Sequence, residues 1–172
     1  MLKEALPALK RVAVLMNGTN AGNVVTFDAM TRTARTVGID TVQILARSAE
    51  DFDEAFDQMA RSRCEAVAVY EDALFIAQAA TLAALAQRHR LPSVGFREFA
   101  DAGGLLAFGV HFPDVWRRAA GYVDRIFKGA KPSELPMEQP GKYDTVVNLR
   151  TAKVLRVTIP PTVLLRAETV IE

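Results

Sequence analysis

Polar and aromatic side chains stand where three short apolar runs of this sequence end. They are Asn17, Thr19, Asn20, Glu71, Asp72, Phe96 and Arg97. If the runs are buried strands, the first group precedes a helix N-terminus, whose free backbone N–H groups favour a carboxylate. The acidic pair suits an ammonium group, and an aromatic ring beside a guanidinium completes a setting for a zwitterion. The sequence therefore points to binding of an amino acid or a similar small polar molecule.

A second interpretation of the same residues is purely structural. Thr19, Asn20 and Asp72 belong to the residue types that accept hydrogen bonds from the first N–H groups of a helix. On this view they cap helices and do nothing else. The sequence leaves both interpretations open.

The motifs of common enzyme classes are missing. After the first run the sequence reads NGTNAG, which does not have the glycine spacing of a dinucleotide-binding loop. No P-loop and no G-x-S-x-G motif is present, and a receiver domain would need an acidic pair where Asn17 and Gly18 stand. Two histidines and one cysteine are too few for a typical ligand set. We expect no enzymatic activity, no cofactor and no metal.

Strands and helices are predicted to alternate along the first part of the chain. Short apolar runs of this kind are typical of strands buried on both faces, and they occupy residues 12–16, 41–45, 66–70, 92–96 and 105–110. Amphipathic stretches between the first four indicate βαβ units. We expect a three-layer αβα domain with a parallel sheet of flavodoxin-like order 2-1-3-4-5, in which Val14 is fully buried.

Three helices are predicted between these strands, at residues 24–36, 49–63 and 73–90. Gly38 ends the first, and Ser48 with Asp51 forms a variant of the capping box at the start of the second. The predicted inward-facing residues are Val25, Ala29 and Thr33, then Phe52, Ala55, Phe56 and Met59, and finally Leu74, Ala77, Leu82 and Leu85.

The regular alternation of predicted strands and helices changes after Phe96. A helix is expected at residues 114–127, and it carries Trp116, Tyr122, Ile126 and Phe127. Residues 129–140 contain three prolines and are predicted to form an irregular linker. A last strand at 143–149, a short helix at 151–156 and an extended tail from Pro160 complete the chain.

Composition narrows the class of protein. The 172 residues are half apolar and carry a net charge of +1, with no basic stripe, so we expect no nucleic-acid partner. No apolar run approaches the roughly 20 residues that span a bilayer. The first ten residues lack the pattern of a signal peptide. If Met1 is the native start, this predicts a cytoplasmic protein.

Several segments together resemble a known family. They are LPALKRVAVLMN at 6–17, LPSVGFREF at 91–99 with GGL at 103–105, NLRTAK at 148–153, IPP at 159–161 and LLRA at 164–167. They look like ABC transporter substrate-binding proteins of the tryptophan/tyrosine-binding type, and the likeness covers essentially the whole chain. The resemblance implies the type I periplasmic binding fold, in which two α/β lobes joined by a three-strand hinge close on a ligand.

The same resemblance divides the chain into three parts. Residues 1–98 resemble the core of the C-terminal lobe, residues 99–130 the segment that returns to the N-terminal lobe, and residues 131–172 the third crossing with the end of the C-terminal lobe. The export signal and most of the first lobe would then be absent from this chain.

The resemblance also implies a function and partners. The chain would bind an amino-acid-like ligand, work with an ABC permease and reside in the periplasm, and Phe75 would join Glu71 and Asp72 at the ligand. Gly18 stands where the family often has proline. The alternative is a stand-alone flavodoxin-like domain that acts through oligomerisation or a protein partner. The apolar residues of the helix at 114–127 would pack on the first lobe of a two-lobe protein. Without that lobe, the helix could fold back onto its own sheet as the fifth helix of a flavodoxin-like domain, or two chains could pair through it, and we expect a homodimer.

Overall fold

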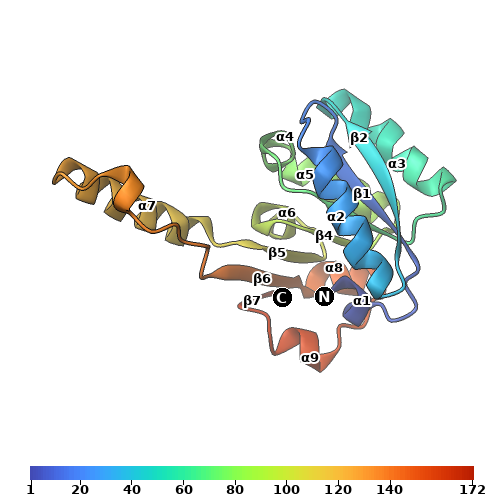
Figure 1. Ribbon diagram of the computed structural model, residues 1–172. Coiled ribbons are helices and arrows are strands. Elements are labelled where there is room, and N and C mark those ends of the chain that lie inside the picture. Colours follow the sequence, from blue (N-terminus) through green and yellow to red (C-terminus); the bar gives the residue numbers. More distant parts are fainter.

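Seven strands form a single sheet in the order β2-β1-β3-β4-β5-β6-β7 (Figure 1). The computed structural model describes residues 1–172 apart from the side chain of Val24. The strands are β1 (Arg11–Asn17), β2 (Asp40–Ala46), β3 (Ala66–Val69), β4 (Ser93–Gly95), β5 (Leu106–Val110), β6 (Tyr143–Asn148) and β7 (Thr169–Ile171). The first five are mutually parallel, so the predicted order 2-1-3-4-5 is confirmed.

Strand β1 has neighbours on both sides and is buried on both faces. Val14 lies opposite Gln43 of β2 and Ala68 of β3, and only 1% of its surface is exposed. The prediction that Val14 is fully buried is confirmed. The unbroken apolar run is explained by this position, because neither face of the strand meets water.

The sheet continues past β5 in a way that the sequence analysis did not predict. Strand β6 runs antiparallel to β5, and β7 is parallel to β6. The antiparallel direction follows from the path of the chain, which leaves the sheet after β5 and returns from the same edge. The strand predicted at 143–149 corresponds to β6, but it is not the last strand of the chain. The prediction of an extended tail was wrong. The tail instead contains a short helix from Pro161, where proline fits the first turn, and then β7.

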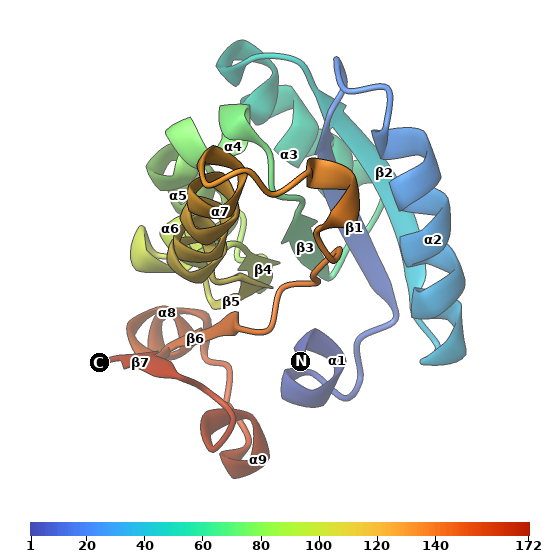
Figure 2. The same cartoon turned by 60° about the vertical axis from the view of Figure 1, so that its left-hand side comes forward.

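Helices cover both faces of the sheet (Figure 2). The helices of the chain are α1 (Leu2–Ala5), α2 (Asn23–Thr36), α3 (Phe52–Arg61), α4 (Ala73–Ala77), α5 (Ala79–Arg88), α6 (Arg97–Asp101), α7 (Phe112–Phe127), α8 (Leu149–Leu155) and α9 (Pro161–Leu164), and all but α7 lie against the sheet or beside it. Helices α3 and α5 share one buried cluster with Leu15 and Val67 of the sheet. Helices α1 and α2 lie with Val12 and Ala66 on the other face. The three-layer architecture is confirmed.

The helix predictions hold to different degrees. All four inward residues predicted for α3 are buried, and the capping box of Ser48 and Asp51 is present. Gly38 has the positive φ of a helix-ending glycine, at 70°. The predicted helix at 73–90 is instead interrupted at Gln78, whose φ and ψ of −115° and 21° are not helical.

The stripe predicted for α2 was wrong. Val25 is 72% exposed, and Ala29 and Thr33 are exposed as well. The half-buried positions are Thr26, Phe27, Met30, Thr31 and Ala34, which have the same helical spacing in a different phase. The larger side chains of that second set, Phe27 and Met30, bury more apolar area, so this phase is the one that faces the sheet.

Helix α7 projects away from the sheet as an arm, which we define as residues 112–142 (Figures 1 and 2). Residues 128–142 return alongside the helix, where the Tyr122 hydroxyl donates to the carbonyl oxygen of Pro136 at 2.6 Å. A short 3₁₀ turn at Pro132–Glu134 interrupts this otherwise irregular return. Helix α7 does not fold back onto its own sheet, and none of its residues is buried.

Candidate functional site

A hollow of about 350 Å³ opens at the carboxyl ends of β4 and β5. Parallel strands bring the loops that follow them to one edge of the sheet, which is where open α/β sheets bind ligands. The hollow is lined by Glu71, Phe96, Arg97, Glu98, Gly109, Val110, His111, Phe112, Pro113 and Asp144. Loops after β3, β4 and β5 contribute, and β6 enters because its antiparallel direction places Asp144 opposite Gly109.

A buried carboxylate organises one wall of this hollow. Asp144 is 6% exposed, and its Oδ1 accepts from His111 Nδ1 at 2.9 Å and from Arg97 Nη1 at 3.5 Å. Arg97 Nε also lies 3.4 Å from Asp101 Oδ2. These contacts hold the Arg97 side chain, 39% exposed, at the hollow, where its guanidinium group can still meet a ligand.

Glu71 is a second, partly buried acid that lines the hollow. Burial raises the pKa of its carboxyl group above the ordinary value, and the negative charge of Glu98 adds to this shift. No hydrogen bond or ion pair of the Glu71 side chain is found within the described part of the chain. A half-buried carboxylate without a partner is a natural acceptor for a cationic group.

The polar residues after β1 hold one another instead of facing the hollow. Asn17 Nδ2 donates to Asp72 Oδ1 at 2.9 Å, and Asp72 Oδ1 also accepts from the backbone N–H of Leu74 at 3.0 Å. Thr19 donates to Asn17 Oδ1 through its backbone N–H and its hydroxyl. The capping interpretation thus describes Asp72, while Asn17 and Thr19 shape the loop.

Asn20 accepts from the Gly22 backbone N–H at 3.0 Å, just before α2. Like Asn17, Thr19 and Asp72, it is not among the residues that line the hollow. The structure therefore brings Glu71, Phe96 and Arg97 together and leaves these four polar residues outside.

Phe75 does not face the strand ends. Its side chain is fully buried and packs edge-on against Phe52, with ring centroids 5.9 Å apart. The expectation that it contacts a ligand does not fit this position, because α4 turns Phe75 toward the core beneath α3. Phe96 is also almost fully buried, at 2% exposed, yet it reaches the surface of two adjoining hollows.

The second hollow, of about 220 Å³, is apolar. It shares Glu71 and Phe96 with the first and lies on the face of the sheet that α2 covers only in part. Met30, Ala68, Val94 and Phe108 form its walls. A polar compartment and an apolar compartment thus meet at Glu71.

A family model described as ABC transporter substrate binding protein matches residues 1–171. The chain belongs to this family. The match includes the sheet, both hollows and the arm. It confirms the resemblance seen in the sequence segments.

Solved structures show the same fold. A conserved domain protein from Vibrio cholerae O1 biovar El Tor has 25% identity and a TM-score of 0.89, with 98% of this chain and 57% of that chain covered. The ABC domain from Streptococcus pneumoniae in complex with L-Trp has 22% identity and a TM-score of 0.88, over 99% and 59%. The ligand-free, open structure of a substrate-binding protein from Clostridium difficile has 17% identity and a TM-score of 0.73, over 99% and 57%. This family member therefore spans less than two thirds of their length. A search among curated proteins finds no significant match.

Among the lining residues of the hollow that sequence reasoning missed, His111 and Asp144 are the two that form its hydrogen-bonded wall. His111 follows the fifth apolar run, so the rule that selected Arg97 after the fourth run would have found it. Asp144 carried no such signal, because it lies at the start of a strand whose antiparallel direction was not predicted.

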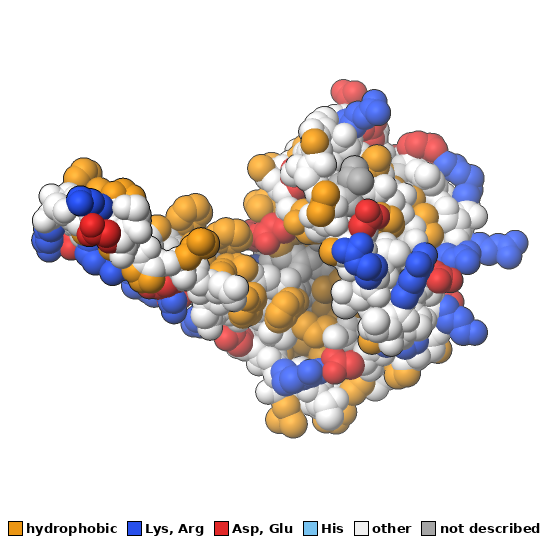
Figure 3. Space-filling view, in the orientation of Figure 1, with side chains coloured by type: hydrophobic (Ala, Val, Ile, Leu, Met, Phe, Trp, Pro, Cys, Tyr) orange, Lys and Arg blue, Asp and Glu red, His pale blue; other side chains and the backbone are white. Residues whose placement is uncertain are grey.

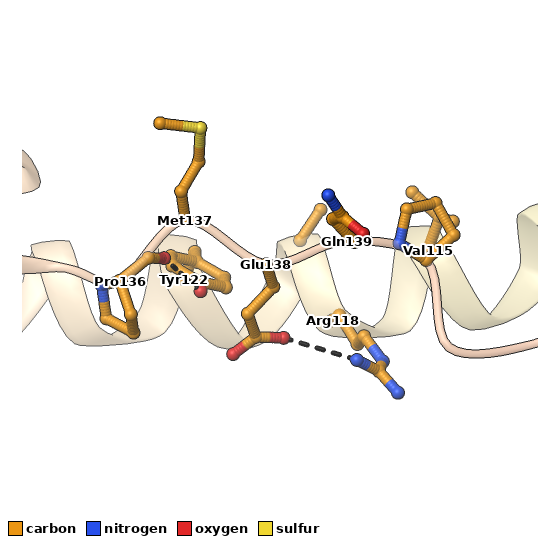
Figure 4. A pocket seen from close by; sticks show the side chains of 9 residues that line it. Val115, Arg118, Tyr122, Pro136, Met137, Glu138 and Gln139 are labelled. Atoms are coloured by element: carbon orange, nitrogen blue, oxygen red, sulfur yellow. Dashed lines mark hydrogen bonds and ion pairs between the residues drawn. The ribbon is translucent and has the colours of Figure 1, made fainter.

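A further hollow, of about 360 Å³, lies within the arm, between α7 and its return segment (Figure 4). The Arg118–Glu138 ion pair, at 3.3 Å, and the Tyr122–Pro136 hydrogen bond cross it. Met137 at its edge is fully exposed. This hollow reflects how the return segment lies on the helix, and it carries no group like Glu71 or Asp144.

The described residues contain no group of three or more His, Cys, Asp or Glu side chains placed to hold a metal ion. In the same part of the chain, no helix combines the length and apolar character needed to cross a bilayer.

Proposed function

We propose that this chain is a solute-binding lobe of an ABC-type transport system and that its ligand is an amino acid or a similar small polar molecule. The observation that carries the proposal is the hollow at the strand ends, which is lined both by the unpartnered Glu71 and by the half-buried Arg97. Groups of both signs in one concave site match the two charged ends of a zwitterion. The L-Trp bound to the Streptococcus pneumoniae relative supports this choice.

The orientation of the ligand follows from the charges that line the hollow. Glu71, Glu98 and Asp144 outnumber Arg97, and Asp144 is already paired with Arg97 and His111. We assign the ammonium group to Glu71 and the carboxylate to Arg97. The ligand side chain then points into the apolar compartment beside Val94 and Phe108.

Binding without chemical conversion is the activity that this site supports. None of its groups forms a nucleophile–base pair of the kind that covalent catalysis needs among the described residues that line it. An ABC permease as partner and a periplasmic location are the corresponding proposals for the whole protein, and both rest on the family.

The test is titration calorimetry of the chain with amino acids. We expect heat of binding at millimolar concentrations or below, and a loss of about tenfold or more in affinity for Glu71→Gln and Arg97→Gln, because each removes a charged hydrogen bond. Glu50→Gln and Arg32→Gln are matched controls, since both side chains are exposed and lie outside both hollows.

An unchanged affinity in both hollow variants would contradict the assignment of the ligand's ends. Binding of carboxylic acids that lack an amino group, with the affinity of the amino acid itself, would contradict the role of Glu71. No heat with any amino acid would contradict binding by this lobe.

A further inference from the structure

The two ends of the arm are joined by side chains as well as by the sheet. His111 directly precedes the arm, and its backbone N–H donates to the carbonyl oxygen of Lys142, the last residue of the return segment, at 3.0 Å. The ring of His111 also contacts Asp144, just after the arm, with 2.9 Å between Nδ1 and Oδ1. The space-filling view shows that the arm meets the body over a narrow neck (Figure 3). We call these three residues the root of the arm.

His111 precedes helix α7 but does not cap it. Its side chain makes no hydrogen bond to the first turn of the helix. The ring instead contacts Asp144, which is 6% exposed. A carboxylate buried this far is unfavourable unless donors surround it. The contact between the two side chains therefore contributes to holding the ends of the arm together.

Arg97 reaches the same oxygen atom of Asp144 from the body of the chain. Its Nη1 lies 3.5 Å from Asp144 Oδ1 and 3.5 Å from Thr169 Oγ1, and its Nε lies 3.4 Å from Asp101 Oδ2. All three distances exceed the roughly 2.7–2.9 Å of a well-formed charge-assisted hydrogen bond. Arg97 is therefore held mainly by charge, whereas the contact of Asp144 with His111 has the length of a well-formed hydrogen bond.

We propose that Asp144 links the ligand site to the root of the arm by exchanging partners. A ligand carboxylate that binds Arg97 displaces Asp144, because it can approach the planar guanidinium with two short parallel hydrogen bonds. Asp144 Oδ1 then contacts His111 alone, and the contact between the two ends of the arm is strengthened. The identity of the ligand rests on the proposed function, whereas the contacts at the root are present without a ligand.

This exchange makes Asp144 a positioning residue that also competes with the ligand. Part of the free energy of ligand binding is spent on separating Arg97 from Asp144. By linkage, any change that weakens this ion pair strengthens ligand binding, and any change that strengthens the pair weakens it. The partners of Asp144 can therefore be tested by the sign of their effects.

Trp116, the only tryptophan, lies where it can report on the root of the arm. It stacks on Phe112 with ring centroids 6.0 Å apart, and Phe112 directly follows His111. A change in the contacts of His111 should therefore alter the emission maximum or intensity of Trp116. L-Leucine and L-phenylalanine are suitable probes, because neither absorbs where tryptophan is excited selectively.

The first measurement needs no ligand. Arg97→Gln leaves Asp144 with His111 alone, which is the arrangement proposed for the ligand-bound chain. The emission of this variant without ligand should therefore match that of the wild type with L-leucine or L-phenylalanine bound. Arg32→Gln is the control, since Arg32 is exposed and lies outside both hollows, and its emission should equal that of the ligand-free wild type.

Calorimetry with the same two amino acids should give effects of opposite sign. Asp144→Asn removes the charge that competes for Arg97, so the affinity should rise about two- to fivefold, the contribution of a partly exposed ion pair. His111→Phe leaves Asp144 with Arg97 alone, so the affinity should fall by a similar factor. The amides of these amino acids lack the carboxylate, and their affinity should change little in either variant. A merely structural role would weaken binding of both kinds of ligand in both variants.

Asp101→Asn separates competition for Arg97 from the link to the arm. Asp101 contacts Arg97 from the same helix and does not touch the root. This variant should bind the amino acids more tightly than the wild type and still change its Trp116 emission on binding. Asp144→Asn should also bind more tightly, but without a change in emission. Circular dichroism checks that each variant is folded, and if Asp144→Asn is not, Arg97→Gln and His111→Phe still decide.

Three results would overturn the proposal. The first is ligand-free Arg97→Gln with the emission of the ligand-free wild type. The second is a ratio of amino-acid to amide affinity that Asp144→Asn and His111→Phe change in the same direction. The third is an Asp144→Asn variant whose emission still responds to the ligand. If no amino acid binds although Arg97→Gln shifts the emission, the proposed function is wrong and displacement by a ligand with it, while the link between Arg97 and the root stands.

Discussion

Helices α3 and α7 are about equally amphipathic, yet the apolar residues of α3 are buried and those of α7 are not. Phe52, Phe56 and Met59 of α3 are fully buried against the sheet and α5. No residue of α7 is buried. The comparison shows that an apolar stripe indicates only that a helix packs against some apolar surface. Whether the partner lies in the same chain depends on where the connecting strands place the helix.

The largest expected effect separates these two helices directly. Phe56→Ala should lower the free energy of unfolding by about 3–5 kcal/mol, because it removes a fully buried ring and leaves a cavity. Phe127→Ala should change it by less than about 0.5 kcal/mol at concentrations where the chain is monomeric. Chemical denaturation measures both. Equal losses would mean that α7 packs on its own body.

A smaller effect of the same kind is expected between β1 and α2. Val14→Ala should cost about 1–3 kcal/mol, since Val14 lies in the centre of the sheet. Val25→Ala is the matched control, because Val25 is exposed on a helix, where alanine is the better former. A midpoint of denaturation that Val14→Ala leaves unchanged would contradict a central β1.

The next effect concerns the loop beyond β3. Asp72→Ala should lower the free energy of unfolding by about 0.5–2 kcal/mol, because Asp72 caps α4 and accepts from Asn17. Asn20→Ala should cost less, since Asn20 accepts only one exposed backbone hydrogen bond. Thermal unfolding measures both. If ligand affinity falls while stability does not, Asp72 would return to the list of ligand contacts.

Replacement of Glu71 should change the free energy of unfolding by a smaller amount, and this change should depend on pH. Its pKa is raised by burial and by Glu98, so the folded state holds the proton more tightly than the unfolded state. The contribution of Glu71 to stability therefore falls as pH rises from 4.5 through the raised pKa. Glu71→Gln should be at least as stable as the wild type at pH 7, and the difference should shrink toward acid pH. A variant that loses stability at pH 7 would contradict a strained, unpartnered carboxylate.

The smallest effect is expected at the surface contact between α1 and the segment after α9. Arg166 donates to Glu4, and the N-terminal ammonium group adds to this, so the pKa of Glu4 is lowered to about 2. The stability that this carboxylate contributes is present above pH 4.5 and is lost as pH falls toward 2. Arg166→Ala should therefore be slightly less stable than wild type at neutral pH and equal to it near pH 2. A difference that persists at pH 2 would point to lost packing instead of lost charge.

The candidate site was predictable in part. Glu71, Phe96 and Arg97 were predicted because strand ends meet at one edge of a parallel sheet, a rule that needs only the order of the elements. The structure places all three in one hollow, and their contact with a ligand stays a prediction. Asn17, Thr19, Asn20 and Asp72 satisfied the same rule, but short polar side chains bond to nearby backbone and to one another before they reach a ligand. Phe75 was misplaced because one turn of helix decides whether a ring faces a cleft or the core.

The sequence by itself determined the strands β1 to β5, their parallel order and the buried stripe of α3. These features depend on local periodicity and on the handedness of βαβ connections, and both are determined by residues that are close together in the sequence. Only the tertiary structure decided that β6 is antiparallel, that Asp144 therefore joins His111 and Arg97, and that α7 stands away from the sheet. Those features depend on where the chain re-enters the sheet after the long segment between β5 and β6. That position is determined by contacts between residues that lie far apart in the sequence.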